Sequence, residues 1–140
     1  MKDSGIVGNY SMILDSKWRL SLPKKADAEV NYKDEIIVVL RDDYIELRTI
    51  ESIRNEFEEI KENIKKASSL EIVSYWEDKF NKLCFDVQKK LCVDSNGRVT
   101  LGCDIAKKYS FLDGVMVVGF YDCFRVYSLS SYELEINKRK

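Results

Sequence analysis

The sequence predicts an α+β fold that is mostly β: two copies of a β-β-α-β-β unit with a helical hairpin inserted between them. One pattern occurs twice, at residues 14–22 and 93–101, as an apolar residue, Asp-Ser-x-x-Arg, and then alternating apolar and hydroxyl residues. At the same offset of 79 residues, later strand-like runs and turn positions also coincide. Between the copies, apolar residues recur at helical spacing. We interpret this self-similarity as an internal duplication in which the copies share a core.

Each copy of the pattern predicts a β-hairpin, with strands at 9–14 and 18–22 in the first copy and at 87–93 and 97–101 in the second. Apolar–polar alternation flanks a short polar gap, which commonly holds a type I turn followed by one left-handed residue. Gly97 suits that last position because it has no Cβ. Trp18 stands there in the first copy, where left-handed backbone costs on the order of 1–2 kcal/mol. We therefore expect a different loop geometry in the first copy.

The remaining strands and short helices follow in the same order in each half. Pro23 presets the backbone for a helix after the first hairpin, and apolar runs then predict a strand pair. The first half, residues 8–50, has a helix at 24–31 and strands at 35–40 and 44–48. The second half, residues 84–140, has a helix at 104–109, strands at 115–118 and 124–127, and a last helix opened by a capping box at 130–133.

Residues 51–83 form the predicted helical insert. Thr49 suits the N-cap of its first helix, and a Ser-x-x-Glu capping box beginning at Ser68 opens the second. We expect this hairpin to pack on the sheet of one half or on a neighbouring subunit, with Trp76 in a core. The apolar faces consist of Ile53, Phe57, Ile60 and Ile64 in the first helix and Ile72, Val73, Trp76, Phe80 and Leu83 in the second.

Composition limits the classes of function. The formal net charge is −1 at pH 7, so binding to nucleic acid has to rest on a local patch. No stretch resembles a signal peptide or is long enough to span a bilayer, which predicts a cytoplasmic protein without a membrane partner. The chain has no histidine, and its cysteines have no zinc-site spacing. We expect all four to be reduced, buried side chains: Cys84, Cys92, Cys103 and Cys123.

A local cationic patch surrounds the first Asp-Ser-x-x-Arg pattern. If Asp15 orients Arg19, the guanidinium suits a phosphate or the O6/N7 edge of guanine, while nearby lysines make sequence-independent phosphate contacts. The same arrangement is weaker in the second copy. Alternatively, the acid–arginine pairs only stabilise the turns, and Trp18 either stacks at a DNA-facing tip or fills a subunit contact. The candidate binding residues are Asp15, Lys17, Arg19, Lys24, Lys25, Asp94, Asn96 and Arg98.

The sequence does not favour an enzyme. It has no glycine-rich phosphate loop and no nucleophile elbow, and a cysteine nucleophile would lack its usual histidine base. We expect no cofactor, no bound metal and no small-molecule substrate.

Residues 8–10 and 14–25 resemble the opening of the MraZ family, and residues 94–98, 115–119 and 124–127 are similar to that family's second half. The resemblance covers nearly the whole chain. It implies an AbrB-like swapped-hairpin (double-split) barrel in a ring-shaped homo-oligomer. It also implies a nucleoid-associated bacterial transcriptional regulator that binds short direct repeats of double-stranded DNA ahead of the operon for cell division and cell-wall synthesis. Asp15, Arg19, Asp94 and Arg98 are then the signature positions on the DNA-facing surface.

A second class of function stays open. AbrB-like antitoxins are oligomeric modules that bind a partner protein, and the insert helices with Trp76 and Phe80 offer such a surface. Binding to duplex DNA that weakens steeply with ionic strength separates a regulator from this alternative.

Overall fold

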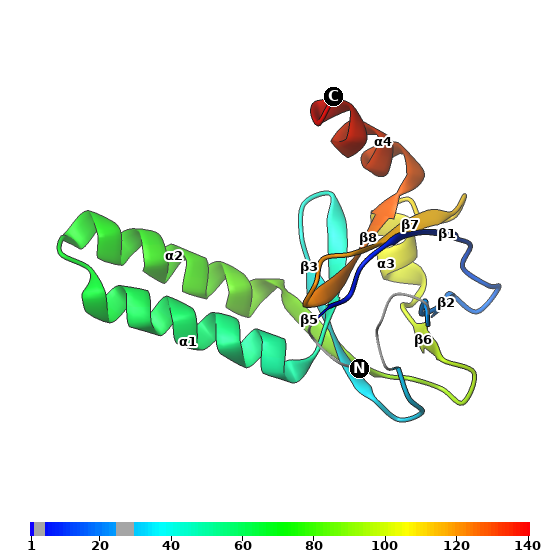
Figure 1. Ribbon diagram of the computed structural model, residues 1–140, viewed down its shortest axis with the longest axis horizontal. Helices are drawn as coiled ribbons and strands as arrows, with labels where there is room; N and C mark the ends of the chain where they lie inside the picture. The colour runs from blue at the N-terminus through cyan, green and yellow to red at the C-terminus, as the bar shows by residue number, and fades with distance from the viewer. Residues whose placement is uncertain (2–4, 25–29) are drawn as a thin grey trace.

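The computed structural model describes residues 1, 5–24 and 30–140, in which the chain forms eight strands and four helices. An α+β fold is therefore confirmed. Six strands form one antiparallel sheet in the order β1-β7-β8-β4-β3-β5, and β2 and β6 form a separate ribbon (Figure 1). The elements are β1 (Asn9–Met12), β2 (Arg19–Ser21), β3 (Glu35–Leu40), β4 (Tyr44–Arg48), α1 (Ile50–Lys66), α2 (Leu70–Asp86), β5 (Val87–Cys92), β6 (Arg98–Thr100), α3 (Cys103–Lys108), β7 (Val115–Gly119), β8 (Cys123–Ser128) and α4 (Leu129–Lys138).

The two expected hairpins are present only as turns, and the prediction that their strands pair with each other is wrong. β1 pairs with β7 and β5 pairs with β3, whereas β2 pairs with β6. Alternation along a strand determines which side chains share a face, but it does not determine which strand lies alongside. Pairing across the chain brings Leu20 and Val99 together in one core, where their exposed fractions are 0% and 1%.

Strand pairing follows an approximate twofold axis. Leu20 lies opposite Val99 in the ribbon, and Glu46 lies opposite Arg125 in the sheet; each pair is related by the 79-residue offset. Each end of the ribbon is extended by a matching backbone hydrogen bond, from Leu22 N to Gly97 O at 3.0 Å and from Leu101 N to Trp18 O at 2.9 Å. Strands of both halves thus share one sheet, and the predicted boundaries of the halves stay a prediction.

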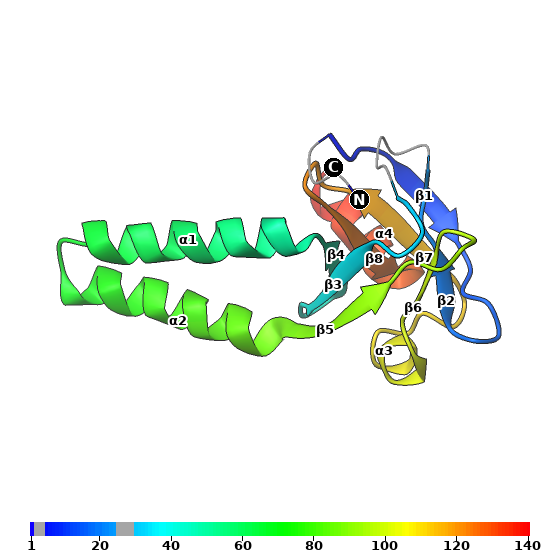
Figure 2. The ribbon, with the colours of Figure 1, turned by 90° about the horizontal axis from the view of Figure 1, so that it is seen from below.

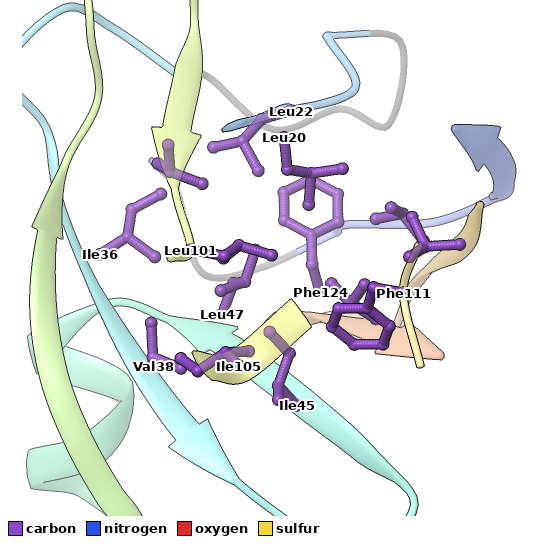
Figure 3. Close-up of a cluster of buried hydrophobic side chains, with 14 of the residues drawn as sticks. Leu20, Leu22, Ile36, Val38, Ile45, Leu47, Leu101, Ile105, Phe111 and Phe124 are labelled. Atoms are coloured by element: carbon purple, nitrogen blue, oxygen red, sulfur yellow. The ribbon is translucent and has the colours of Figure 1, made fainter. Parts of the chain in front are cut away.

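The main core lies among the six-stranded sheet, the ribbon and α3 (Figure 3). Leu20 and Val99 anchor the ribbon in it, and Ile105 contributes from α3, which closely matches the helix predicted at 104–109. The corresponding helix of the first half, predicted at 24–31, falls largely on residues 25–29, which lie outside the described part of the chain. The core therefore holds the ribbon's inner face and leaves its outer face available.

The helical insert is an arm that projects from the sheet (Figure 2). Its helices contact each other through the rings of Phe57 and Phe80, whose centroids are 5.0 Å apart. Only the base of the arm packs on the sheet, where Ile53 and Leu83 join Ile37 and other residues in a second core cluster. The expectation that the hairpin packs on the sheet is therefore met only at the base of the arm, because the two apolar faces otherwise cover each other. Packing on a neighbouring subunit stays a prediction.

Within the arm, Trp76 is half-buried and packs against this second cluster. The helix α2 extends to Asp86, beyond the predicted end at residue 83. Leu83 is its last buried apolar residue, and an apolar pattern cannot locate turns that continue past the last buried position.

Helix caps agree with the sequence at one position and differ at two. Thr49 Oγ1 accepts a hydrogen bond from Ser52 N at 3.1 Å, as predicted. The second helix is capped by Ser69 rather than Ser68, and the last helix by Ser128 rather than Ser130. Consecutive or closely spaced serines all offer a capping oxygen, so the capping-box spacing alone did not select the residue where the backbone becomes helical.

The cysteines differ from the expectation of four buried side chains. All four are free thiols, but only Cys123 is buried, while Cys84 and Cys92 are exposed and Cys103 is half-buried. Cys84 follows buried Leu83 on the arm, and Cys92 ends β5, an edge strand. Their positions on a projecting helix and a sheet edge explain the exposure.

Candidate nucleic-acid interface

The two Asp-Ser-x-x-Arg patterns fold into matching turns, each closed by its own aspartate. Asp15 Oδ1 accepts hydrogen bonds from the backbone N–H of Lys17 at 2.9 Å and of Arg19 at 3.0 Å. In the second turn, Asp94 Oδ1 accepts from Asn96 N and Arg98 N, both at 2.9 Å. A short carboxylate side chain that satisfies amides two residues on is a common way to close a turn. One oxygen of each carboxylate therefore fixes the backbone.

Trp18 adopts the same left-handed conformation as Gly97, with φ of 61° against 75°. The expectation of a different loop geometry in the first turn is wrong. Trp18 is half-buried and packs against the main core cluster, and burial of an aromatic side chain offsets a backbone cost of roughly 1–2 kcal/mol. This packing holds Trp18 against its own chain; its predicted roles in DNA stacking or in a subunit contact stay predictions.

The second oxygen of each carboxylate contacts an arginine. Arg19 Nε donates to Asp15 Oδ2 at 2.6 Å, and Arg98 Nε donates to Asp94 Oδ2 at 3.0 Å. In addition, Arg98 Nη1 lies 3.7 Å from Asp15 Oδ2. The two turns, far apart in sequence, thus meet side by side, and both guanidinium groups lie against the carboxylate of Asp15.

The ribbon presents both arginines on its outer face. Arg19 lies opposite Thr100, and Ser21 lies opposite Arg98. Because side chains alternate along a strand, these four residues share the face that is opposite Leu20 and Val99. Ser21 and Thr100 are exposed. They were missing from the predicted site, although the alternation of apolar and hydroxyl residues in both patterns is the signal that locates them.

Both aspartates are held in the charged form. The backbone N–H of Arg98 is the largest influence that lowers the pKa of Asp94 below its ordinary value of 3.8, helped by Asn96 N–H and the Arg98 guanidinium. For Asp15, desolvation raises the pKa, but the N–H groups of Arg19 and Lys17 and the Arg19 guanidinium outweigh it, so the net shift is downward. At neutral pH the site therefore holds two carboxylates and two guanidinium groups.

Lysines supply the positive charge that the aspartates do not cancel. Lys17 and Lys24 are exposed, and a Cβ at Gly97 would lie 3.6 Å from Lys24 Cε, which places the Lys24 side chain beside the second turn. Asn96 is exposed at that turn as well. Lys25 lies outside the described residues. The structure therefore brings Lys24 and the two arginine turns together, and it leaves Lys25 without a described position.

Among the described residues, the two Asp-Ser-x-x-Arg turns hold neither a metal-binding cluster nor part of the cavity near the arm. No group of three or more Cys, Asp or Glu side chains that could hold a metal ion occurs among residues 1, 5–24 and 30–140. The cavity between the base of the arm and the outer face of β4 and β8 has a volume of about 1130 Å³ and a lining of mixed charge. None of the residues of the two Asp-Ser-x-x-Arg turns lines this cavity.

Comparison with known proteins adds one relative. The chain is 29% identical over 128 residues to the transcriptional regulator MraZ of Mycoplasmopsis pulmonis (strain UAB CTIP), which covers 91% of this chain and 82% of that protein. No protein-family model matches the chain. The similarity is too extensive to lie within one half of the chain. Separately, no helix in the described ranges is both long enough and apolar enough to cross a membrane.

Proposed function

We propose that this chain is a DNA-binding transcriptional regulator of the MraZ type that binds short direct repeats of duplex DNA through the outer face of the β2–β6 ribbon. Similarity to a transcriptional regulator over 91% of the chain supports the class of function. The observation that carries the proposal is the meeting of both arginine turns on this face, with Arg98 Nη1 3.7 Å from Asp15 Oδ2. As the family resemblance implies, such a regulator acts on the operon for cell division and cell-wall synthesis.

The chemistry of the ribbon suits base recognition. A two-stranded antiparallel ribbon fits the major groove of B-form DNA, and arginine is the side chain that most often reads guanine there through O6 and N7. Arg19 and Arg98 are each steadied by a carboxylate, so they lose less rotamer freedom when they bind. Thr100 and Ser21 add a hydroxyl opposite each arginine. Exposed Lys17 and Lys24 are placed to contact phosphates, which carry no sequence information.

The proposed DNA-binding face of one chain carries little net positive charge for binding phosphates, because two aspartates neutralise the charges of the two arginines. We infer that the protein self-associates into a ring, so that several ribbons bind spaced repeats at high effective concentration. The open edge strands β1 and β5 support association, as do Leu70 and Phe85 on the arm, which are 86% and 85% exposed. Crossed strand pairing, of β1 with β7 and of β5 with β3, supports the AbrB-like swapped-hairpin architecture. The proposed location is the cytoplasm, in association with the nucleoid.

Selection of bound fragments from random duplex DNA, followed by fluorescence anisotropy on the selected duplex, tests the proposal. The Arg19→Ala, Arg98→Ala double variant should lose at least tenfold in preference for the selected duplex over a scrambled one, since a bidentate arginine–guanine contact is worth roughly 1–3 kcal/mol. Arg54→Ala removes an exposed arginine from α1 and serves as the matched control. Light scattering should give a mass well above 16.3 kDa for one chain.

Two results would contradict the proposal in different ways. A double variant that binds like the wild type would show that the arginines are structural ion pairs of the turns. Failure of the wild-type protein to retain any duplex at low salt, together with co-purification of a second protein, would favour the antitoxin-like interaction module instead.

A further inference from the structure

The two arginine turns are not equivalent, because Asp15 contacts both arginines. Its Oδ2 atom lies 2.6 Å from Arg19 Nε and 3.7 Å from Arg98 Nη1. Asp94 Oδ2 lies 3.0 Å from Arg98 Nε, and no ion pair between Asp94 and Arg19 occurs in the described part of the chain. Arg98 is therefore held between two carboxylates, whereas Arg19 depends on Asp15.

We propose that Asp15 is a positioning residue for both arginines, and that each chain therefore reads a single compact element of adjacent base pairs rather than two separated half-sites. This inference rests on the proposed DNA-binding function. Because both guanidinium groups contact the same carboxylate oxygen, the distance between them corresponds to no more than about two base-pair steps, each ~3.4 Å along the DNA axis. Dimeric readers of palindromes instead place their reading elements about one helical turn apart, roughly 34 Å. Separate repeats must then be read by separate chains.

Electrostatics explain why the shared carboxylate matters. Two guanidinium groups this close repel each other, and an acid between them offsets that repulsion. Without Asp15, Arg19 loses its charged partner, and Arg98 loses one of its two. The element read is therefore expected to contain guanine at one or both of two neighbouring positions, since each arginine offers a bidentate donor pair to O6 and N7.

Paired asparagine substitutions separate this role from a structural one. In Asp15→Asn the remaining side-chain oxygen can still accept from the N–H groups of Lys17 and Arg19, which close the turn, while the charge that faces the arginines is removed. Asp94→Asn is the matched control, because it makes the same change at a carboxylate that holds only Arg98. Thermal melting of both variants checks that the fold is intact.

The readout is preference between two fluorescein-labelled duplexes: one selected by the wild-type protein from random DNA, and the same duplex with its preferred guanines replaced. We expect Asp94→Asn to reduce this preference roughly tenfold and Asp15→Asn roughly a hundredfold, because Asp94→Asn weakens the positioning of Arg98 alone, whereas Asp15→Asn weakens that of both arginines. A purely structural aspartate would change melting temperature and overall affinity, but not the preference between duplexes.

A second measurement holds even if Asp15→Asn fails to fold. The duplex preference is measured for Arg19→Ala, Arg98→Ala and the double variant. If the two arginines act as one unit, the fold-loss of the double variant is smaller than the product of the two single fold-losses. If they act independently, it equals that product. Substituting each base pair of the selected duplex in turn should locate all sensitive positions of one repeat within two or three adjacent base pairs.

Three results would overturn the compact site while leaving DNA binding intact. The two asparagine variants could reduce the duplex preference equally, or the losses from the two single arginine variants could multiply in the double variant. The third is that the sensitive base pairs of one repeat form two clusters half a helical turn apart. Absence of any duplex preference by the wild-type protein would overturn the proposed function itself, and the compact site with it.

Discussion

At the scale of single residues, one carboxylate in each turn both closes the backbone turn and holds the arginine side chain. Oδ1 of Asp94 accepts from backbone N–H groups and Oδ2 accepts from Arg98, so backbone shape and side-chain direction depend on the same charge. Asp15 has the same arrangement with Arg19 and adds Arg98. Protonation of either aspartate therefore weakens the turn and the arginine together.

This dependence predicts a loss of stability in acid. The pKa values of Asp15 and Asp94 are lower in the folded protein than the ordinary 3.8, so the folded state binds these protons less readily than the unfolded state. Their contribution is complete above about pH 4 and is lost as the pH falls through the lowered folded values. Melting temperature from pH 6 to pH 2.5 should fall less steeply in the Asp15→Asn, Asp94→Asn double variant than in the wild type. Parallel curves would contradict the coupling.

The cysteines give a second prediction at this scale. Burial is the largest cause that raises the pKa of the Cys123 thiol to about 12, with Glu46 and Asp122 adding to it. Because the thiolate is the reactive form, Cys123 should not be alkylated by iodoacetamide at pH 8 until the protein is unfolded. Exposed Cys84 and Cys92 should react in the folded state. Peptide mass spectrometry measures each site, and rapid labelling of Cys123 in the native protein would contradict its burial.

At the scale of elements, a network of charges fixes the arm to the sheet. Arg48, at the end of β4, donates from Nε to Ser52 Oγ at 2.9 Å and from Nη1 to Glu56 at 2.5 Å, both on α1. Arg41 contacts Asp86 at the end of α2 at 3.3 Å. Arg48 thus ties α1 to the sheet, and Arg41 ties α2 and also lies 3.9 Å from Glu56 of α1. Glu46 contacts both arginines.

Loss of this attachment should be costly. The Arg48 side chain is 6% exposed, and Arg48→Met leaves Glu46 and Glu56 without this cation, so we expect a loss of about 3 kcal/mol in the free energy of unfolding. Lys61→Met breaks the exposed pair with Glu58 and should change it by less than ~1 kcal/mol. Urea denaturation measures both variants. Equal losses would mean that the network does not hold the arm.

At the scale of the whole molecule, the proposed interface uses different residues for two tasks: the arginines contact bases, and the lysines attract the phosphates. Because the charges of the paired arginines and aspartates of the turns nearly cancel, the proposed attraction to phosphate would come mainly from lysines such as Lys17 and Lys24. The proposed division depends on the fold, which brings Lys24 beside the second turn and both turns onto one ribbon.

Salt dependence tests the division. Lys17→Gln with Lys24→Gln should reduce the slope of log affinity against log salt by about two per bound chain, with the base preference unchanged. The Arg19→Ala, Arg98→Ala variant should lose base preference with a smaller change in slope. Anisotropy titrations from 50 to 300 mM salt give both quantities. Loss of base preference in the lysine variant would show that charge and base reading are not separate.

Much of the local structure was predictable from the sequence. The turn residues, the runs that become β3 and β4, and the Thr49 cap depend on neighbours in sequence, and the strands and this cap lie where the pattern placed them. The serine caps were misplaced by one or two positions, because adjacent serines compete for the same role. Trp18 also defied local preference, since its contact with the core is a tertiary effect.

By itself, the sequence determined the α+β class, the positions of the two Asp-Ser-x-x-Arg turns and the amphipathic helices of the arm, because short-range alternation, capping and turn chemistry act within a few residues. Only the tertiary structure decided that β2 pairs with β6, that Arg98 reaches Asp15, and that the arm projects from the sheet. Those outcomes depend on which apolar faces are buried together across the chain, and a periodic pattern specifies a face without specifying its partner.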